Sequence, residues 1–445
     1  MTRFVLMVLV LKIFSYSLYA QEVIELTLER SLKIALENNP NYIASLKRVD
    51  EAKGKRWEAI SELLPALDLR ETTTLREKVI EVEIPAFFPG QRPTKARFDF
   101  TKDYEFNLFF TQPIYTGGKL AANLKQSIYN FKLNEEIENQ TKQTLIFEIK
   151  RTFYGYLVAQ ELLKFSQEAL ELGEKHLERT KVLYEQGIAS KLDLMRAEVQ
   201  VANLKPQKIK AENNLKLVEI SLKNLLGLDP KIPIKIKGSL EHRDIQLDSQ
   251  NILKKAIEKR PELNQLRYQR GIGEQILKIA KASYIPNFSI VGSFNYRMDR
   301  LTLNRKVWDE YYSVNLVLTY PIFAGVSREA KIMQSKAILE RIDYTYKAVE
   351  DAVRIEIEEA LLNLKEAKEI IESQERNIEQ AKESVRIAEL NYEEGLVTSL
   401  EVLTAHQALT QAEMNLSQAL YSWLVASAKL ERATGIPLEE LEKIG

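Results

Sequence analysis

Hydrophobic and polar residues alternate along four segments of the chain, and these are residues 67–77, 103–114, 287–298 and 312–320. In the second of them, Tyr104, Phe106 and Leu108 are separated by single polar residues. A period of two over about ten residues is typical of a membrane barrel strand that turns an apolar face to lipid. It is equally typical of a soluble antiparallel sheet with one buried face. The pattern therefore predicts four strands, and the Tyr and Phe residues near their ends favour the membrane alternative.

Long helices are predicted directly after the strands, in residues 118–184 and 327–392. Both segments are rich in Leu, Ala, Glu, Lys and Gln, which favour helix, and their apolar residues recur at helical spacing. A helix of about 66 residues rises about 100 Å. Gly187 and Gly395 are predicted to end these helices, because glycine readily adopts the left-handed conformation that follows a helix. Shorter helices are predicted after them, at 191–226 and 399–434.

The chain repeats one unit twice. Gln-Pro-Ile-Tyr-Thr-Gly at 112–117 recurs 208 residues later as Tyr-Pro-Ile-Phe-Ala-Gly at 320–325, and Gly187 recurs at the same offset as Gly395. A constant offset over so many residues indicates a tandem duplication. The expected corners between strand and helix are Pro113, Gly117, Pro321 and Gly325. The predicted division is a signal peptide at 1–20, a first repeat at 21–230, a connector at 231–246, a second repeat at 247–437 and a tail at 438–445.

The N-terminal segment has the features of a secretory signal peptide. Arg3 gives it a positive start, residues 4–11 are apolar, and Ala20 is a small residue before the expected cleavage site. No later segment has the roughly 18 consecutive apolar residues of a membrane helix. The sequence therefore predicts export, either as a soluble extracytoplasmic protein or as a membrane β-barrel.

Composition excludes several classes of function. The chain has no cysteine and three histidines, His176, His242 and His406, so disulfides, thiolate zinc sites and iron–sulfur clusters are excluded. Lys plus Arg and Asp plus Glu both number 63, and this balance argues against a nucleic-acid partner. Because no catalytic constellation is present, we predict neither an enzyme nor a bound cofactor or metal. His406 has no ligand partner nearby in sequence, so we expect it to be exposed or lightly packed.

Four strands are too few to close a barrel in a membrane. A single-chain barrel needs at least eight, and an open edge in lipid leaves backbone hydrogen-bonding groups without partners. We therefore expect an oligomer in which each copy contributes four strands. Two, three or four copies would give eight, twelve or sixteen strands, and the strand pattern does not choose among them.

The order of the elements and several paired motifs resemble the TolC-like outer-membrane efflux protein family. The motifs are the strand ends at 112–118 and 320–325, the turns Tyr-Glu-Gln-Gly-Ile-Ala-Ser-Lys-Leu-Asp-Leu at 184–194 and Tyr-Glu-Glu-Gly-Leu-Val-Thr-Ser-Leu-Glu-Val at 392–402, and Ala-Thr-Gly at 433–435. The resemblance implies a mostly α-helical fold with a β-barrel portion. It implies a homotrimer whose twelve-stranded outer-membrane barrel is continuous with a long α-helical periplasmic tunnel.

The resemblance also implies a function. Members serve as the outer-membrane exit duct of a tripartite efflux pump or a type I secretion system, and they pass small molecules or proteins without catalysing a reaction. The implied partners are a periplasmic adaptor protein, an inner-membrane pump and outer-membrane lipid. Many relatives are lipoproteins, but this chain has no cysteine to carry the lipid, so it resembles the non-lipidated branch.

The turns at the far ends of the long helices are the expected gate. The resemblance puts Glu401 where acidic residues line the constriction, with Asp193 as its counterpart in the first repeat. Three copies of one carboxylate near an axis would attract cations, and their mutual repulsion would raise their pKa values. However, Ser190 and Thr398 each stand three residues before the acid, which is the spacing of a capping box. Capping alone would explain both acids, and the two roles can coexist.

Tyr392 and Tyr184 match a family tyrosine that joins a closing network in some members. A tyrosine near a helix end also commonly packs its ring and leaves its hydroxyl in water. The chain departs from the best-known members at Val397, where they carry an arginine, and at Thr404, where a second aspartate would stand. We therefore expect a looser or hydrophobic constriction and no salt-bridged lock.

A second hypothesis is a periplasmic coiled-coil adaptor or scaffold without a membrane barrel, because the helical hairpins alone would fit it. Such adaptors normally have one hairpin flanked by small β domains. This chain predicts two hairpins without such flanks, so the exit duct is the leading hypothesis.

Overall fold

The computed structural model describes residues 23–75, 80–98, 103–245, 248–298, 301–302, 304, 308–394 and 396–442. The predicted signal peptide and Gly395 lie outside these residues. The chain forms two compact units: the first comprises Met1–Val49, Asn134–Leu266 and Thr345–Gly445, and the second Asp50–Leu133 and Arg267–Tyr344. None of the helices in the described residues has an apolar stretch that would cross a membrane.

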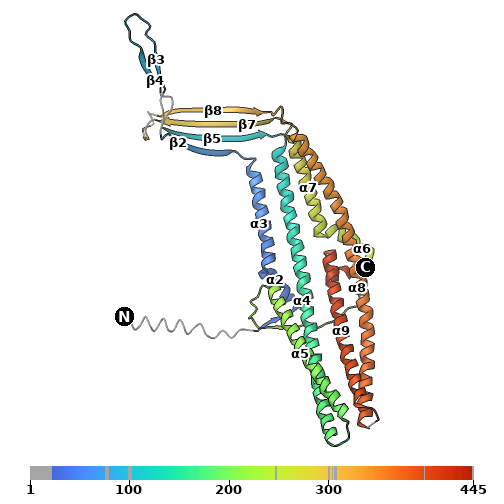
Figure 1. Cartoon of the computed structure of the whole chain (residues 1–445). Coiled ribbons are helices and arrows are strands. Elements are labelled where there is room, and N and C mark those ends of the chain that lie inside the picture. Colours follow the sequence, from blue (N-terminus) through green and yellow to red (C-terminus); the bar gives the residue numbers. More distant parts are fainter. Residues whose placement is uncertain are drawn as a thin grey trace, which may run out of the picture. The chain divides into compact units, whose positions relative to one another are not determined.

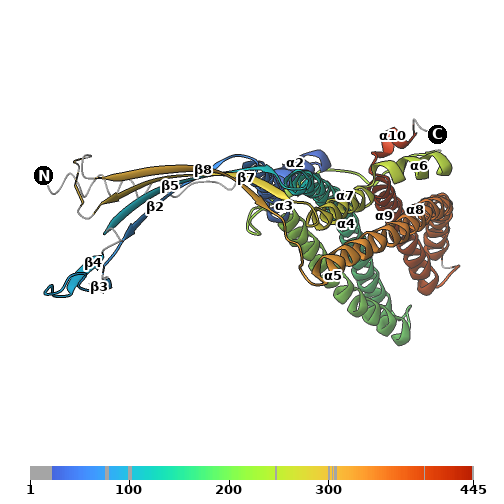
Figure 2. The same ribbon diagram turned by 90° about the horizontal axis from the view of Figure 1, so that it is seen from above.

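The second unit contains a four-stranded antiparallel sheet (Figures 1 and 2). Its strands lie in the order β2 (Ala66–Thr73), β5 (Tyr104–Tyr115), β7 (Asn287–Met298) and β8 (Asp309–Thr319). All four were predicted from the alternation of apolar and polar residues, and the prediction is confirmed. Strands from the two halves of the chain meet at the centre of the sheet, where β5 pairs with β7.

The register brings the apolar positions of all four strands to one face of the sheet. Leu69 pairs with Leu108, Leu108 with Phe294, and Phe294 with Tyr312. The rings of Phe294 and Tyr312 are stacked, with centroids 6.3 Å apart and planes 7° apart. Because side chains alternate between the two faces of a strand, one consistent register produces a continuous apolar face.

Every connection from this sheet to a helix leaves from the same end. The start of β2 pairs with the end of β5, and the start of β7 pairs with the end of β8. Consequently α3 (Pro40–Ser61), α4 (Lys119–Glu185), α7 (Pro261–Ala282) and α8 (Ser327–Glu393) all join that end. At the opposite end the chain forms a hairpin, β3 (Ile80–Ile84) and β4 (Thr94–Phe98). The alternation of apolar and polar residues did not predict this hairpin.

Two glycines allow α7 to approach the long helices of this unit closely. A Cβ added to Gly271 would lie 3.0 Å from the ring of Tyr129 on α4, and one added to Gly273 would lie 2.9 Å from Leu339 on α8. Such distances are shorter than ordinary van der Waals contacts, so larger residues would push the helices apart. Both glycines therefore mark close helix contacts.

The first unit is a helical body that contains residues 134–185 of α4 and 345–393 of α8 together with several shorter elements (Figure 1). The shorter elements are α2 (Leu28–Asn38), α5 (Lys191–Leu225), α6 (Ser249–Lys259), α9 (Ser399–Thr434) and α10 (Leu438–Glu442). A parallel strand pair, β1 (Ile24–Leu26) and β6 (Ile234–Ile236), was not predicted. The predicted tail includes α10, whose Leu441 is fully buried.

Two apolar clusters hold this unit together. One contains Phe153 of α4, Leu222 of α5 and Leu26 of β1. The other contains Ile357 of α8 together with Trp423 and Leu430 of α9. Each long helix therefore packs against the shorter helix that follows it in the chain. Burying side chains of this size stabilises a fold by about 1.5–3 kcal/mol each.

Candidate functional site

The two outer strands of the sheet have open edges. Among the described strands, β2 and β8 each pair on one side only, with β5 and β7 respectively. Their apolar side chains are also exposed: Leu69 by 71%, Val314 by 73% and Leu316 by 70%. A long apolar edge strand with free backbone groups is a template for pairing with another chain. The sheet is therefore incomplete in a single copy.

The other face of the sheet is polar and internally bonded. Arg297 of β7 forms an ion pair with Glu105 of β5 at 3.2 Å, and its guanidinium lies 5.0 Å from the ring centroid of Tyr311 on β8. The hydroxyls of Ser293 and Ser313 are 3.1 Å apart. These contacts join three neighbouring strands, so the sheet separates an apolar face from a hydrophilic one.

The first strand-to-helix corner lies at Gly117. Pro113 is still within β5, at a register shift before Tyr115. Gly117 has φ +63°, and a Cβ there would lie 2.8 Å from the Cβ of Ile285. Gly117 is thus required both for the turn and for close packing. The corner falls on the glycine rather than on Pro113.

The second corner is similar in its backbone but not in its packing. Pro321 follows β8, and its carbonyl accepts a hydrogen bond from Arg328 of α8. Gly325 has φ +62°, and a Cβ there would meet nothing within 4 Å. The guanidinium of Arg328 also lies 5.1 Å from the ring centroid of Tyr284. Both predicted pairs therefore lie where a strand leads into a long helix.

The turn between α4 and α5 contains a complete capping box. The hydroxyl of Ser190 accepts from the Asp193 amide at 3.1 Å and donates to its carboxylate at 2.6 Å, and the Ser190 amide donates to the same carboxylate at 3.2 Å. These bonds from Ser190 lower the pKa of Asp193. Gly187 has φ +75°, as predicted for a residue that ends a helix. Tyr184 is 39% exposed, and its carbonyl accepts from the Gly187 amide.

The turn between α8 and α9 lacks this cap, and the prediction of a capping box there is wrong. Thr398 is the N-cap residue of α9, but its side chain makes no capping hydrogen bond. The Glu401 amide bonds to the Thr398 carbonyl instead, at 3.1 Å. Glu401, Val397 and Thr404 line a largely apolar groove of about 950 Å³ between α8 and α9. The carboxylate of Glu401 is therefore not engaged in capping.

The two predicted gate acids do not form one site within the described chain. Asp193 bonds inside its own turn, whereas Glu401 lies in the groove of the other hairpin. Tyr392 instead meets a cation, because the guanidinium of Arg179 on α4 lies 5.2 Å from its ring centroid. No group of His, Asp and Glu residues in the described ranges has the arrangement of a metal site.

Two histidines near this turn have partners that the sequence did not indicate. His406 was expected to be exposed or lightly packed; its side chain is 18% exposed, and its Nε2 lies 2.9 Å from the Glu389 carboxylate. His176 Nε2 lies 2.9 Å from the hydroxyl of Ser399, the first residue of α9. Glu389 of α8 meets a histidine of α9, and Ser399 of α9 meets a histidine of α4. Residue spacing along a single helix could therefore not indicate either contact.

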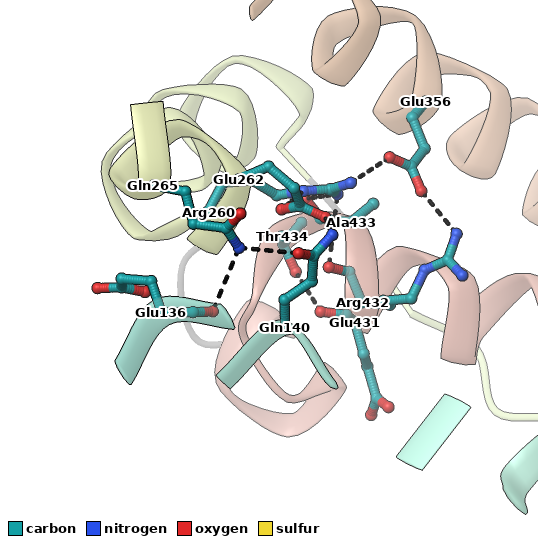
Figure 3. Close-up of polar contacts among 10 residues, drawn as sticks. All are labelled: Glu136, Gln140, Arg260, Glu262, Gln265, Glu356, Glu431, Arg432, Ala433 and Thr434. Carbon is teal, nitrogen blue, oxygen red and sulfur yellow. Dashed lines mark hydrogen bonds and ion pairs between the residues drawn. The ribbon is translucent and has the colours of Figure 1, made fainter. Parts of the chain in front are cut away.

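A buried arginine joins four helices in the first unit (Figure 3). The side chain of Arg260, between α6 and α7, is 7% exposed. It donates to Glu262 at 2.8 Å, to the carbonyl of Ala433 at 2.7 Å and to Glu356 of α8. Burial by itself raises the pKa of Glu356, but the charges and hydrogen bonds of Arg260 and Arg432 outweigh it, so the pKa is lowered.

The same network reaches α4 through amide side chains. Gln265 donates to the side chain of Gln140 at 2.8 Å, and Gln140 donates to Glu262 at 3.2 Å (Figure 3). Sequence reasoning did not find this network. Its only signal was the duplication, because Arg260 stands before Pro261 as Asn39 stands before Pro40. The Asn39 side chain likewise donates to a carbonyl at the end of a helix, that of Leu225 in α5, at 2.9 Å.

Comparisons with known proteins agree with this architecture. The model of the family described as outer membrane efflux protein matches residues 32–228 and 252–436. Outer membrane protein TolC of Vibrio cholerae is 22% identical over 67% of this chain and 69% of its own length. The alkaline protease secretion protein AprF of Pseudomonas aeruginosa is 20% identical over 91% of this chain and 83% of its own.

A solved structure supports the fold independently. The CmeC outer membrane channel of Campylobacter jejuni has a TM-score of 0.78 at 18% identity, over 92% of this chain and 85% of that chain. The relatives are transport proteins, which fits the prediction that the chain is not an enzyme. Since the family model covers most of the chain in two successive matches, the protein belongs to the outer membrane efflux protein family.

Proposed function

We propose that the protein is a passive exit duct in the outer membrane, serving a tripartite efflux pump or a type I secretion system. The observation that carries the proposal is the sheet, which has one apolar face and two open edges. Turned outward, the apolar face would contact lipid, and the polar face with Glu105 and Arg297 would line a water-filled passage.

The directions of the strands allow several copies to close into one barrel. The chain runs towards the hairpin end in β2 and away from it in β8. The β8 edge of one copy would therefore meet the β2 edge of the next in antiparallel orientation, which continues the alternation of the sheet. Closure satisfies the backbone groups that an open edge would leave unpaired in lipid. We infer a homotrimer with twelve strands, in keeping with the family.

The helical part would extend this passage towards the inner membrane. The long helices have 67 residues each, or about 100 Å of helix at about 1.5 Å per residue. A duct of this kind takes its substrate from a periplasmic adaptor and an inner-membrane pump, which are the partners we propose. The alternative of a soluble adaptor or scaffold has no support in the family match or in the relatives, which are named as outer-membrane or secretion proteins.

Cysteine cross-linking of the two edges tests the proposal, and the natural chain has no cysteine to interfere. Arg70→Cys on β2 would be combined in turn with Tyr311→Cys, Ser313→Cys and Asn315→Cys on β8, which all lie on the polar face. Oxidation of outer membranes should give a ladder of bands that ends at three times the mass of the uncross-linked monomer. The control is Arg70→Cys with Asn295→Cys on the central strand β7, which should give no ladder.

Two results would contradict the duct. One is a ladder that never passes a dimer in any of the three combinations. The other is release of the protein from membranes by a carbonate wash, because a transmembrane barrel requires detergent for extraction. Reconstituted protein should in addition give conductance steps in planar bilayers.

A further inference from the structure

Two polar contacts cross between the helical hairpins close to the turn that begins α9. The hydroxyl of Ser399 lies 2.9 Å from Nε2 of His176 on α4. The guanidinium of Arg179, one turn further along α4, lies 5.2 Å from the ring centroid of Tyr392 on α8. The first hairpin, α4–α5, is thereby joined to the second, α8–α9, on either side of the turn at 394–398.

The surroundings of His176 disfavour a charged imidazole. On its own helix it is near Lys175, which pairs with Glu171 at 2.7 Å, and near Arg179 and Thr180. From the second hairpin it is faced by Glu389 and Tyr392 of α8 and by Ser399 and His406 of α9, all but Ser399 lining the same cavity of about 310 Å³. Glu389 is already bonded to His406 at 2.9 Å, so the acid that faces the cavity has another partner.

We propose that neutral His176 links the first hairpin to the start of α9, and that protonation of His176 weakens this link, because it places a second cation beside Arg179 in the same cavity. In the duct proposed above, on which this consequence depends, His176 is a positioning residue for the turn that holds Glu401. The His406–Glu389 bond lies within the second hairpin, between α8 and α9, so it does not join the two hairpins.

The sign of the pH effect follows from the burial of His176. Burial first, and then the charges of Arg179 and His406, lower the pKa of this imidazole. Once the contact opens, the imidazole returns to an ordinary histidine pKa of about 6.5. The open arrangement thus binds the proton more tightly, so the contact is stable above about pH 6.5 and weakens as the pH falls below it. Proton uptake can favour opening by at most about tenfold per pH unit.

Hydrogen exchange of the full-length protein in detergent tests this inference without relying on conduction. The amides of residues 396–406 would be followed at pH 7.5 and 5.5, after correction for intrinsic exchange rates. We expect their exchange to rise several-fold, and by no more than about tenfold, at pH 5.5. His176→Gln keeps a neutral hydrogen-bonding group at this position and should abolish the rise.

Two further variants separate this contact from general acid sensitivity. His242→Gln removes a histidine that instead packs against Trp423, with ring centroids 6.3 Å apart, and it should leave the rise unchanged. Ser399→Ala removes the partner and should make exchange fast at both pH values. Should His176→Gln fold poorly, His176→Asn serves the same purpose.

The inference would be overturned if exchange of residues 396–406 did not change with pH, or if His176→Gln retained the full rise. Conductance in planar bilayers forms a separate measurement. A rise in conductance at pH 5.5 that is lost in His176→Gln would show that the His176–Ser399 contact also controls opening of the passage. Protein that never conducts, yet shows the pH-dependent exchange, would contradict the proposed duct while upholding the contact.

Discussion

The two halves of the chain solve the same two structural problems with different chemistry. At the joint between its paired short helices, the first half uses the neutral amide of Asn39, which binds the carbonyl of Leu225 and accepts from the amides of Asn41 and Tyr42. At the corresponding joint, the second half uses the charged Arg260, which reaches Glu262, Glu356 and the carbonyl of Ala433. The amide reaches one further helix, α5, whereas the guanidinium reaches both α8 and α9.

The two turns that precede α5 and α9 also differ in their hydrogen bonds. Asp193 is bound by Ser190 within the capping box of the first turn, whereas Glu401 in the second turn has no such bond to Thr398. Asp193 is therefore held within its own turn, whereas Glu401 lines the groove between α8 and α9. A residue's position in a duplicated unit therefore predicts where it lies but not what it binds.

Breaking the joints should give the largest effects and the clearest contrast between the halves. Arg260→Ala removes one of the two ion pairs of Glu356, which keeps its pair with Arg432. Removing one partner of a buried pair typically costs about 3–5 kcal/mol, so with Arg432 retained we expect a loss of about 3 kcal/mol. Asn39→Ala should cost about 1–3 kcal/mol, the range for an unsatisfied buried neutral group. Arg270→Ala is the matched control, because Arg270 is half exposed in its pair with Asp343, and its loss should cost at most about 1 kcal/mol.

Thermal unfolding of the purified variants measures this series. Equal losses for Arg260→Ala and Asn39→Ala would remove the distinction between the two joints. The Glu356 carboxylate adds a pH dependence, since its lowered pKa stabilises the folded chain above the ordinary glutamate range. This stability is lost as the pH falls from the ordinary glutamate pKa through the lowered one. Arg260→Ala raises the pKa of Glu356 and should therefore make this acid-dependent loss smaller.

The turns should respond to a smaller perturbation, also unequally. Ser190→Ala removes the capping box of α5 and should cost about 1 kcal/mol. Thr398→Ala removes no side-chain cap from α9, so its effect should be close to zero. Hydrogen exchange in the first turn of each helix distinguishes the two. Faster exchange at the start of α9 in Thr398→Ala, to the same degree as in Ser190→Ala at α5, would mean that Thr398 does cap.

The smallest expected effect concerns ion selectivity. Glu401→Gln should reduce the cation preference of the reconstituted duct by about twofold, the scale expected for an exposed charge that salt partly screens. Asp193→Asn is the matched variant, and it should change the preference less because Ser190 already binds that carboxylate. The reversal potential in a salt gradient measures both. An unchanged potential in Glu401→Gln would remove Glu401 from the passage.

The sequence was sufficient for elements with a strong internal period. The strands follow from alternation, and the helix ends near Gly187 and Thr434 follow from glycine and helical spacing, because these signals are local. The short β1–β6 pair depends on residues 234–236 meeting residues 24–26 far along the chain. No local pattern encodes such a pairing, and three residues are too few to show a period.

The candidate site was less predictable than the fold, for the same reason. The capping box at Ser190 is a local motif and was found. The partners of His176 and Arg260 come from helices far away in sequence, and a histidine or arginine in an otherwise regular helix gives no sign of which neighbour it will meet. The identical spacing at Thr398 shows that even a local motif does not ensure the bond.

The pairing at the centre of the sheet has a consequence for ancestry. There, the second long strand of one half of the chain, β5, lies beside the first strand of the other half, β7. The proposed seam between copies joins the same kinds of strand, β8 with β2. A peptide of half this length would carry both edges, so six such peptides could build the ring that three full chains are proposed to build. Fusion of two genes would then have halved the number of seams between separate chains, from six to three, and freed each half to change separately.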